Sequence, residues 1–174
     1  IDQPQKACLS NFVGTCNILQ ACREFNSERL IYSSTSSAYG LKNTPPLTED
    51  MPKDCLSPYS VSKTGGEELC KVYNSLYGVK TVTLRYFNVY GDRQPTKGEY
   101  APIIGRFLKL KSKKEALTIV GDGSQKRDYT HVEDIVDANI LAAKNKKIGN
   151  AEIINIGSGK NYSVLELINI INAK

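Results

Sequence analysis

The sequence lacks the features that mark membrane, metal-binding and secreted proteins. It has no run of about 18 apolar residues that could form a membrane-spanning helix, and its first residues lack the basic start and apolar stretch of a signal peptide. There is one histidine, His131, and the five cysteines form no Cys-x-x-Cys pair. These counts argue against a metal site and against a disulfide framework. We therefore expect reduced thiols in a cytoplasmic protein that binds no metal.

The excess of positive charge is small and local. The formal net charge is +5, and lysines gather within residues 109–114 and 144–147. Both clusters fall where helices are predicted to end, and cations there complement the helix dipole. Aromatic residues are not interleaved with these lysines, so the pattern does not favour binding to nucleic acid. The charge is compatible instead with an anionic small-molecule ligand.

Predicted helices and strands alternate along the chain. Amphipathic spacing predicts a helix over residues 5–25, and Ser57 followed by Pro58 predicts the start of a second helix that Gly78 ends. A third helix is predicted over residues 102–112. Capping-box patterns at Thr130 and Ser163 predict the starts of two more helices, the first running to about residue 145. Strands are predicted at residues 29–33, 81–86, 117–120 and 152–156.

This alternation is typical of an α/β fold with a mostly parallel sheet flanked by helices. A doubly wound dinucleotide-binding sheet opens with a strand, a Gly-x-Gly-x-x-Gly turn and a helix, but no segment here supplies that turn. We therefore expect residues 1–92 to form the second half of such a domain. Residues 93–174 are expected to form part of a small substrate-binding α/β region, with some elements returning to the first sheet. The polypeptide is predicted to be incomplete at both ends.

Tyr59 and Lys63 lie four residues apart, on one face of the helix that Pro58 begins. A lysine cation one turn away favours the phenolate form of a tyrosine, which makes the pair a candidate general base. The spacing alone is weak evidence, because about one Tyr-x-x-x-Lys is expected by chance in a chain of this composition. The serine-rich segment at residues 33–37 follows a predicted strand, where ligands sit in open α/β sheets. Taken alone, it would equally fit a polar turn.

Six segments of the chain resemble, in the same order, the motifs of the extended short-chain dehydrogenase/reductases. Within that family they are most similar to the nucleotide-sugar epimerases. The resemblance extends over essentially the whole chain, and the order and spacing of the segments are far more specific than any one of them. The segments are Asn11–Asn17, Ser33–Gly40, Ser57–Lys63, Leu84–Gly91, Gly121–Val132 and Asn155–Gly159.

The resemblance implies a partial Rossmann-like doubly wound sheet, NAD as cofactor, and a nucleotide-diphosphate sugar, first of all a UDP-sugar, as substrate. It implies that Tyr59 takes the proton of the sugar's 4-hydroxyl, that Lys63 holds the nicotinamide ribose, and that Thr35 hydrogen-bonds the reacting oxygen. Arg127 would bind the pyrophosphate, for which its planar fork is suited. The implied cofactor residues are Ser33, Tyr59, Lys63, Tyr86 and Phe87, and the implied substrate residues are Thr35, Asn88 and Arg127.

Other roles are open for some of these residues. Arg127 could pair with Asp128 or Glu133, and Asn88 could cap a turn. His131 is assigned to structure, since it lies at a predicted helix start where it can satisfy backbone groups.

The family contains several activities. Ser36 and Ser37 stand where the related 4,6-dehydratases and decarboxylases carry an acidic residue, so we expect C4 epimerisation. There are two alternatives. One is a reductase of the same family, and the other is an inert fragment that binds NAD poorly because it lacks the glycine-rich turn. The resemblance also implies a homodimer through the helices near residues 5–25 and 58–77.

Overall fold

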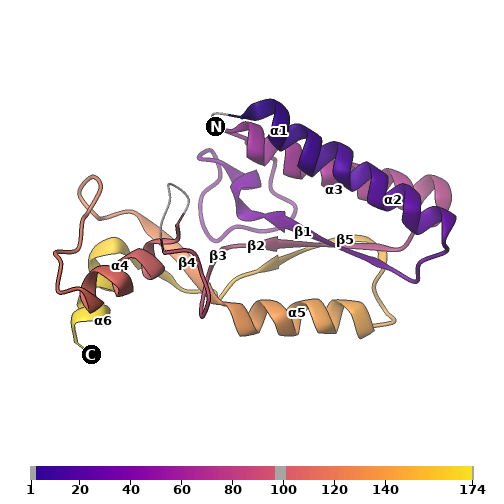
Figure 1. Cartoon of the computed structure of the whole chain (residues 1–174). Helices are drawn as coiled ribbons and strands as arrows, with labels where there is room; N and C mark the ends of the chain where they lie inside the picture. Colours follow the sequence, from indigo (N-terminus) through magenta and orange to yellow (C-terminus); the bar gives the residue numbers. More distant parts are fainter. Residues whose placement is uncertain (1–2, 97–100, 174) are drawn as a thin grey trace. The chain divides into compact units, whose positions relative to one another are not determined.

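The computed structural model describes residues 3–96 and 101–173 and divides into two compact units (Figure 1). The first unit comprises Ile1–Tyr86 and Ala138–Ile156, and the second comprises Phe87–Asp137 and Gly157–Lys174. The predicted α/β fold class is confirmed, because parallel strands alternate with helices. The roles predicted for residues 1–92 and 93–174 stay predictions.

The first unit begins with a long helical segment and contains the longest helix of the described residues. α1 (Pro4–Cys8), a π-helical turn (Leu9–Val13) and α2 (Gly14–Glu24) follow one another without a break. α3 runs over Pro58–Tyr77, as predicted. Its N-cap Ser57 accepts a hydrogen bond from the Ser60 amide, and Gly78 ends it with a left-handed φ of 69°.

The sheet of the first unit is parallel, with strand order β1-β2-β5. β1 is Leu30–Thr35, β2 is Thr81–Tyr86 and β5 is Asn150–Ile156. The register places Thr35 opposite Tyr86 and Tyr86 opposite Ile156, so the carboxyl ends of the three strands lie at one edge. This edge is where open α/β sheets bind ligands.

Helices cover both faces of this sheet, which makes it doubly wound (Figure 1). Alternate residues of β1 serve the two sides: Tyr32 packs with Leu19 of α2 and Cys70 of α3, whereas Ile31 packs in the cluster that contains Ala142. Ala142 belongs to α5 (Val132–Lys144). The chain crosses from β1 to β2 through α3, as parallel neighbours require.

Among its described residues, the second unit holds the strands β3, β4 and β6, the helices α4 and α6, and the start of α5. β3 (Asn88–Tyr90) pairs in parallel with β4 (Lys126–His131), which pairs antiparallel with β6 (Asn161–Ser163). α4 covers Ile103–Ser112 and α6 covers Val164–Asn172. The predicted capping box of α6 is present, with Ser163 and Glu166 each accepting the other's backbone N–H. Of the predicted lysines, Lys109 and Lys111 lie in the last turn of α4 and Lys144 lies in the last turn of α5.

Two predictions for this unit are wrong. Residues 117–120 form no strand; Val120 is 77% exposed, and β4 pairs with β3 and β6 instead. A β-branched run stabilises a strand only when a neighbouring strand completes its ladder. Thr130 does not cap α5, because it lies within β4 and its hydroxyl donates to Asp128. β4 itself was not predicted, since Lys126, Arg127 and Asp128 are not typical of strands.

Candidate active site

Thr35 is the last residue of β1 and is 7% exposed. Its Oγ1 accepts a hydrogen bond of 3.1 Å from the Ser37 amide, which caps a short 3₁₀ turn over Ser36–Tyr39. Because Oγ1 accepts this bond, the Thr35 hydroxyl hydrogen can be donated to a ligand oxygen. The strand end therefore presents an oriented hydroxyl donor.

Tyr59 and Lys63 lie one turn apart near the start of α3, which packs against β1. Tyr59 is 46% exposed, while Lys63 is half-buried, and burial holds the pKa of the Lys63 ammonium below its usual value. Between them, Ser62 donates to the Tyr59 carbonyl at 2.9 Å and accepts from Asn11 at 3.0 Å. Asn11 thus ties the N-terminal helical segment to the turn that carries both candidates.

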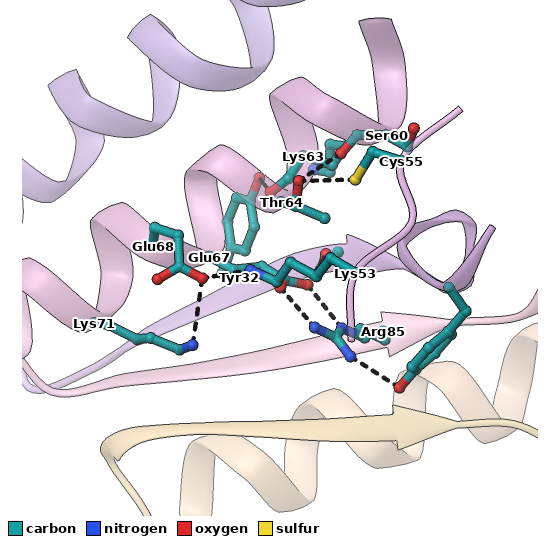
Figure 2. Close-up of polar contacts among 12 residues, drawn as sticks. Tyr32, Lys53, Cys55, Ser60, Lys63, Thr64, Glu67, Glu68, Lys71 and Arg85 are labelled. Carbon is teal, nitrogen blue, oxygen red and sulfur yellow. Dashed lines mark hydrogen bonds and ion pairs between the residues drawn. The ribbon is translucent and has the colours of Figure 1, made fainter. Parts of the chain in front are cut away.

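A buried ion pair between Glu67 and Arg85 lies one helical turn beyond Lys63 (Figure 2). Glu67, one turn beyond Lys63, accepts from Nε of Arg85 at 2.9 Å and from Nη2 at 2.8 Å. The Ser34 hydroxyl donates to the same carboxylate at 2.6 Å, and Lys53 lies 3.1 Å from it. Arg85 also donates to the Tyr39 hydroxyl at 2.9 Å. The ion pair therefore joins α3 to the ends of β1 and β2, beside Thr35.

Burial tends to raise the pKa of Glu67, but the hydrogen bonds from Arg85 and Ser34 outweigh burial and hold that pKa below its usual value. Glu67 is thus a carboxylate matched to a cation rather than a proton donor. Neither Glu67 nor Arg85 was predicted from the sequence. The available signal was spacing, because Tyr59, Lys63 and Glu67 recur every four residues along one helix face.

Ser33 and Tyr86, both predicted at the cofactor, are brought together at the carboxyl edge. Their hydroxyl oxygens are 3.2 Å apart, and the side-chain amide of Asn139 lies within hydrogen-bond distance of the Tyr86 hydroxyl. Asn139 was not predicted. It lies on α5 and fixes the Tyr86 phenol from the side of the sheet opposite to α3.

Two of the three predicted substrate residues, Asn88 and Arg127, line one cavity of about 380 Å³ in the second unit. The third, Thr35, belongs to the first unit. The parallel register places Asn88 opposite Tyr129, two residues after Arg127 on the same side of β4. Arg127 is exposed, and its Nη1 donates to the Lys126 carbonyl at 2.8 Å. Phe87, which was predicted to contact the cofactor, is half-buried and is not among the residues that line this cavity. The cavity combines an amide, a guanidinium and aromatic walls, which suits a flat base with an anionic group.

Asp128 organises this cavity from its buried side. Its carboxylate accepts from the amides of Ser158 at 2.9 Å and of Gly159 at 2.8 Å, and its carbonyl accepts from the Asn88 side chain at 2.9 Å. A Cβ at Gly157 would lie 2.9 Å from that carboxylate, so a larger residue there would have to displace the Asp128 side chain.

One alternative partner proposed for Arg127 is therefore engaged elsewhere, because the Asp128 carboxylate holds the turn at residues 157–159. His131 has the structural role predicted for it, because its Nδ1 accepts from the Glu133 amide at the start of α5.

The family model for the NAD dependent epimerase/dehydratase family matches residues 1–157. A putative UDP-glucose 4-epimerase of Methanocaldococcus jannaschii is 44% identical over 92% of this chain and 52% of its own length. A UDP-N-acetyl-alpha-D-glucosaminuronate decarboxylase of Bacillus cytotoxicus is 42% identical over 91% of this chain and 49% of its own length. The chain thus spans about half the length of the curated relatives it matches.

Solved structures agree with this result. UDP-N-acetylglucosamine 4-epimerase from Methanobrevibacter ruminantium superposes with a TM-score of 0.95 at 34% identity, over 99% of this chain and 55% of that chain. UDP-glucuronic acid 4-epimerase from Bacillus cereus, solved with UDP-glucuronic acid and NAD, superposes with a TM-score of 0.86 at 36% identity. The match covers 95% of this chain and 51% of that chain. These neighbours confirm the predicted partial Rossmann-like fold. Among the residues described, no helix is long and apolar enough to cross a membrane.

Proposed function

Because this chain belongs to the NAD dependent epimerase/dehydratase family, we propose that its protein interconverts the C4 epimers of a nucleotide-diphosphate sugar, first of all a UDP-sugar. The observation that carries the proposal is the packing of α3, which carries Tyr59 and Lys63, against β1, which ends at the oriented Thr35 hydroxyl. The relatives named as UDP-sugar 4-epimerases support it.

The proposed cofactor is NAD, as in the Bacillus cereus neighbour. The donor set fits a dinucleotide, since Lys63, Ser33 and Tyr86 offer an ammonium and two hydroxyls near the carboxyl end of a parallel sheet. We assign Lys63 and Tyr59 to the nicotinamide ribose, and Ser33, Tyr86 and Phe87 to the nicotinamide end. When bound, NAD would supply the oxidation and re-reduction of the sugar carbon.

The residues of the chain would remove and return the proton of the sugar's 4-hydroxyl. Tyr59 takes the proton of the 4-hydroxyl as that carbon is oxidised to the 4-keto sugar, and later returns it. Thr35 donates a hydrogen bond to the same oxygen, which stabilises the negative charge that develops on it. After the keto sugar rotates in the site, reduction on its other face would give the epimer.

For the nucleotide part of the substrate we propose Asn88 and Arg127. The Arg127 guanidinium is exposed at the cavity and offers two parallel N–H donors to pyrophosphate oxygens. The Asn88 amide has its orientation set by the Asp128 carbonyl, which leaves its oxygen as an acceptor.

The test is turnover of UDP-galactose or UDP-N-acetylgalactosamine by the protein expressed from its complete gene, with catalytic NAD. Epimerisation predicts conversion of the sugar with no net formation of NADH. Steady consumption of NADH would identify a reductase instead. Release of carbon dioxide from a UDP-sugar acid would identify a decarboxylase, the activity named for one relative. The serines at positions 36 and 37 favour epimerisation, because they offer no carboxyl group.

We also propose a homodimer and a cytoplasmic location. Exposed apolar side chains on α2 and α3 and on the π-helical turn support a helical interface; they are Leu9, Val13, Ile18, Val61, Val72 and Leu76. The described chain has five free cysteines, the state expected of a reducing compartment.

A further inference from the structure

Tyr32 touches Lys63 at two points. The Nζ of Lys63 lies 4.5 Å from the centroid of the Tyr32 ring, which is within the range of a cation–π contact. The Tyr32 hydroxyl donates to the backbone carbonyl of Lys63 at 3.0 Å. One side chain therefore contacts both the ammonium and the main chain of the same lysine (Figure 2).

The position of Tyr32 is itself tightly fixed. Tyr32 lies in the middle of β1, is 7% exposed, and packs with Leu19, Cys70 and Val79. Burial raises the pKa of the Tyr32 phenol to about 12, so the hydroxyl stays protonated and can donate at any pH near neutrality. A rigid, neutral aromatic ring thus faces the lysine.

Gly66 provides a second, independent observation. A Cβ at this position would lie 2.2 Å from the Tyr32 hydroxyl oxygen and 2.6 Å from its Cζ. Glycine is unfavourable inside a helix compared with alanine, so a glycine in the middle of α3 needs a packing reason. Here the absent side chain is what allows the Tyr32 hydroxyl to reach the helix backbone.

We propose that Tyr32 is a positioning residue, whose ring holds the Lys63 ammonium and whose hydroxyl fixes the helical turn that carries it. A lysine side chain is flexible and binds its partner as a point charge, so a supporting ring would restrict the places the ammonium can occupy. The proposal rests on the proposed function, in which Lys63 holds the ribose of the cofactor. It assigns Tyr32 no contact with substrate.

The first test is spectroscopic and needs no turnover. In the protein expressed from its complete gene with ¹³Cε-labelled lysine, the Lys63 signal is identified by its loss in Lys63→Arg. A lysine above a ring face has its ε-proton resonances moved upfield by the ring current. We expect this upfield position in the wild type and in Tyr32→Phe, which keeps the ring, and its loss in Tyr32→Leu. An ordinary lysine position in the wild type would overturn the proposal.

The second test is kinetic. Tyr32→Leu should lower kcat by about tenfold or more and weaken NAD binding, because Lys63 is then misplaced, whereas Tyr32→Phe should stay within about threefold of wild type. Circular dichroism and the Tm show that each variant is folded. A folded Tyr32→Leu variant with wild-type kcat and NAD affinity would refute the positioning role. Absence of any turnover in the wild type would refute the proposed function, and the resonance of Lys63 would still decide the role of Tyr32.

Two glycine variants supply a matched pair. Gly66→Ala should move Tyr32, shift the Lys63 resonance and lower kcat, despite the better helix propensity of alanine. Gly65→Ala lies one residue away, and its Cβ would meet the partly exposed Phe12 ring instead. It should change both readouts less than Gly66→Ala does, because the exposed Phe12 ring can move aside. Equal effects of the two variants on the Lys63 resonance and on kcat would count against the proposal.

Discussion

Glu67 and Arg85 form a bidentate ion pair in the first unit, and both side chains are at most 1% exposed. Removing Arg85 leaves the buried Glu67 carboxylate to the partly exposed Lys53 ammonium, which compensates the charge less well. Arg85→Met should therefore lower the free energy of unfolding by about 3–5 kcal/mol, measured by urea denaturation.

The double variant Glu67→Met, Arg85→Met removes both charges of the pair and tests whether stability is recovered. It should recover much of the loss, since hydrophobic residues of similar volume can replace a buried pair. Lys71→Met is the control, because it removes only the exposed ion pair with Glu68 and should cost less than about 1 kcal/mol. A single Arg85 variant as stable as the control would contradict the prediction.

Stability should depend on pH through Glu67. Its folded-state pKa lies below the ordinary value of 4.5, so the unfolded chain binds the proton more readily. The stabilisation is therefore complete above that ordinary value and is lost as pH falls through the lower folded pKa. Thermal unfolding between neutral pH and pH 3 should show a steeper acid loss of Tm for the wild type than for Glu67→Gln. Parallel curves would show that Glu67 does not contribute.

Tyr59→Phe should reduce kcat by about 10² or more, because the phenol that exchanges the substrate proton is lost. The NAD affinity should change little, since the ring remains. Tyr77→Phe is a matched control on the same helix, far from the strand ends, and should behave as wild type. Turnover by Tyr59→Phe at the wild-type rate would remove Tyr59 from the mechanism.

Arg127→Ala should raise KM for the UDP-sugar by about 10- to 100-fold, because charge-assisted hydrogen bonds are worth about 1.5–3 kcal/mol. Arg127→Lys should rescue only in part, since an ammonium cannot reproduce the planar fork. The exposed neighbour Lys126 provides the control, and Lys126→Ala should leave KM within about threefold. If both alanine variants raised KM equally, the effect would be one of overall charge.

Light scattering should give the mass of a dimer for the protein expressed from its complete gene. Leu76→Glu places a charge on the exposed apolar side of α3 and should shift the equilibrium toward monomer, because an interface core excludes unpaired charge. Leu41→Glu alters a leucine that is even more exposed, in a loop, and should remain dimeric. A wild type that is monomeric at micromolar concentration would contradict the proposed assembly.

The regular elements of the first unit could be read from the sequence because local and tertiary signals agree there. Ser57, Pro58 and Gly78 mark α3 to the residue, and the β-branched run of β2 lies in the centre of a sheet. The second unit differs. β4 carries Lys126, Arg127 and Asp128, and is a strand only because β3 and β6 pair with it. Residues 117–120 have a strand composition but no strand pairs with them.

The candidate site was predictable where its residues belong to motifs, as for Thr35, Tyr59 and Lys63, whose roles stay predictions. The supporting contacts were not predictable, because they join distant segments. Ser34 meets Glu67, Asn88 meets the Asp128 carbonyl, and Asn139 meets Tyr86. No spacing along a single segment encodes these pairs, since each depends on which elements pack together.

The chain passes from one compact unit to the other three times, at residues 86/87, 137/138 and 156/157. One of these junctions falls inside α5. Neither unit is therefore one continuous stretch of sequence, and a chimera that borrowed the second unit from a relative would have to be spliced at three places. A swap of residues 87–137 alone would leave behind residues 157–174, which belong to the same unit.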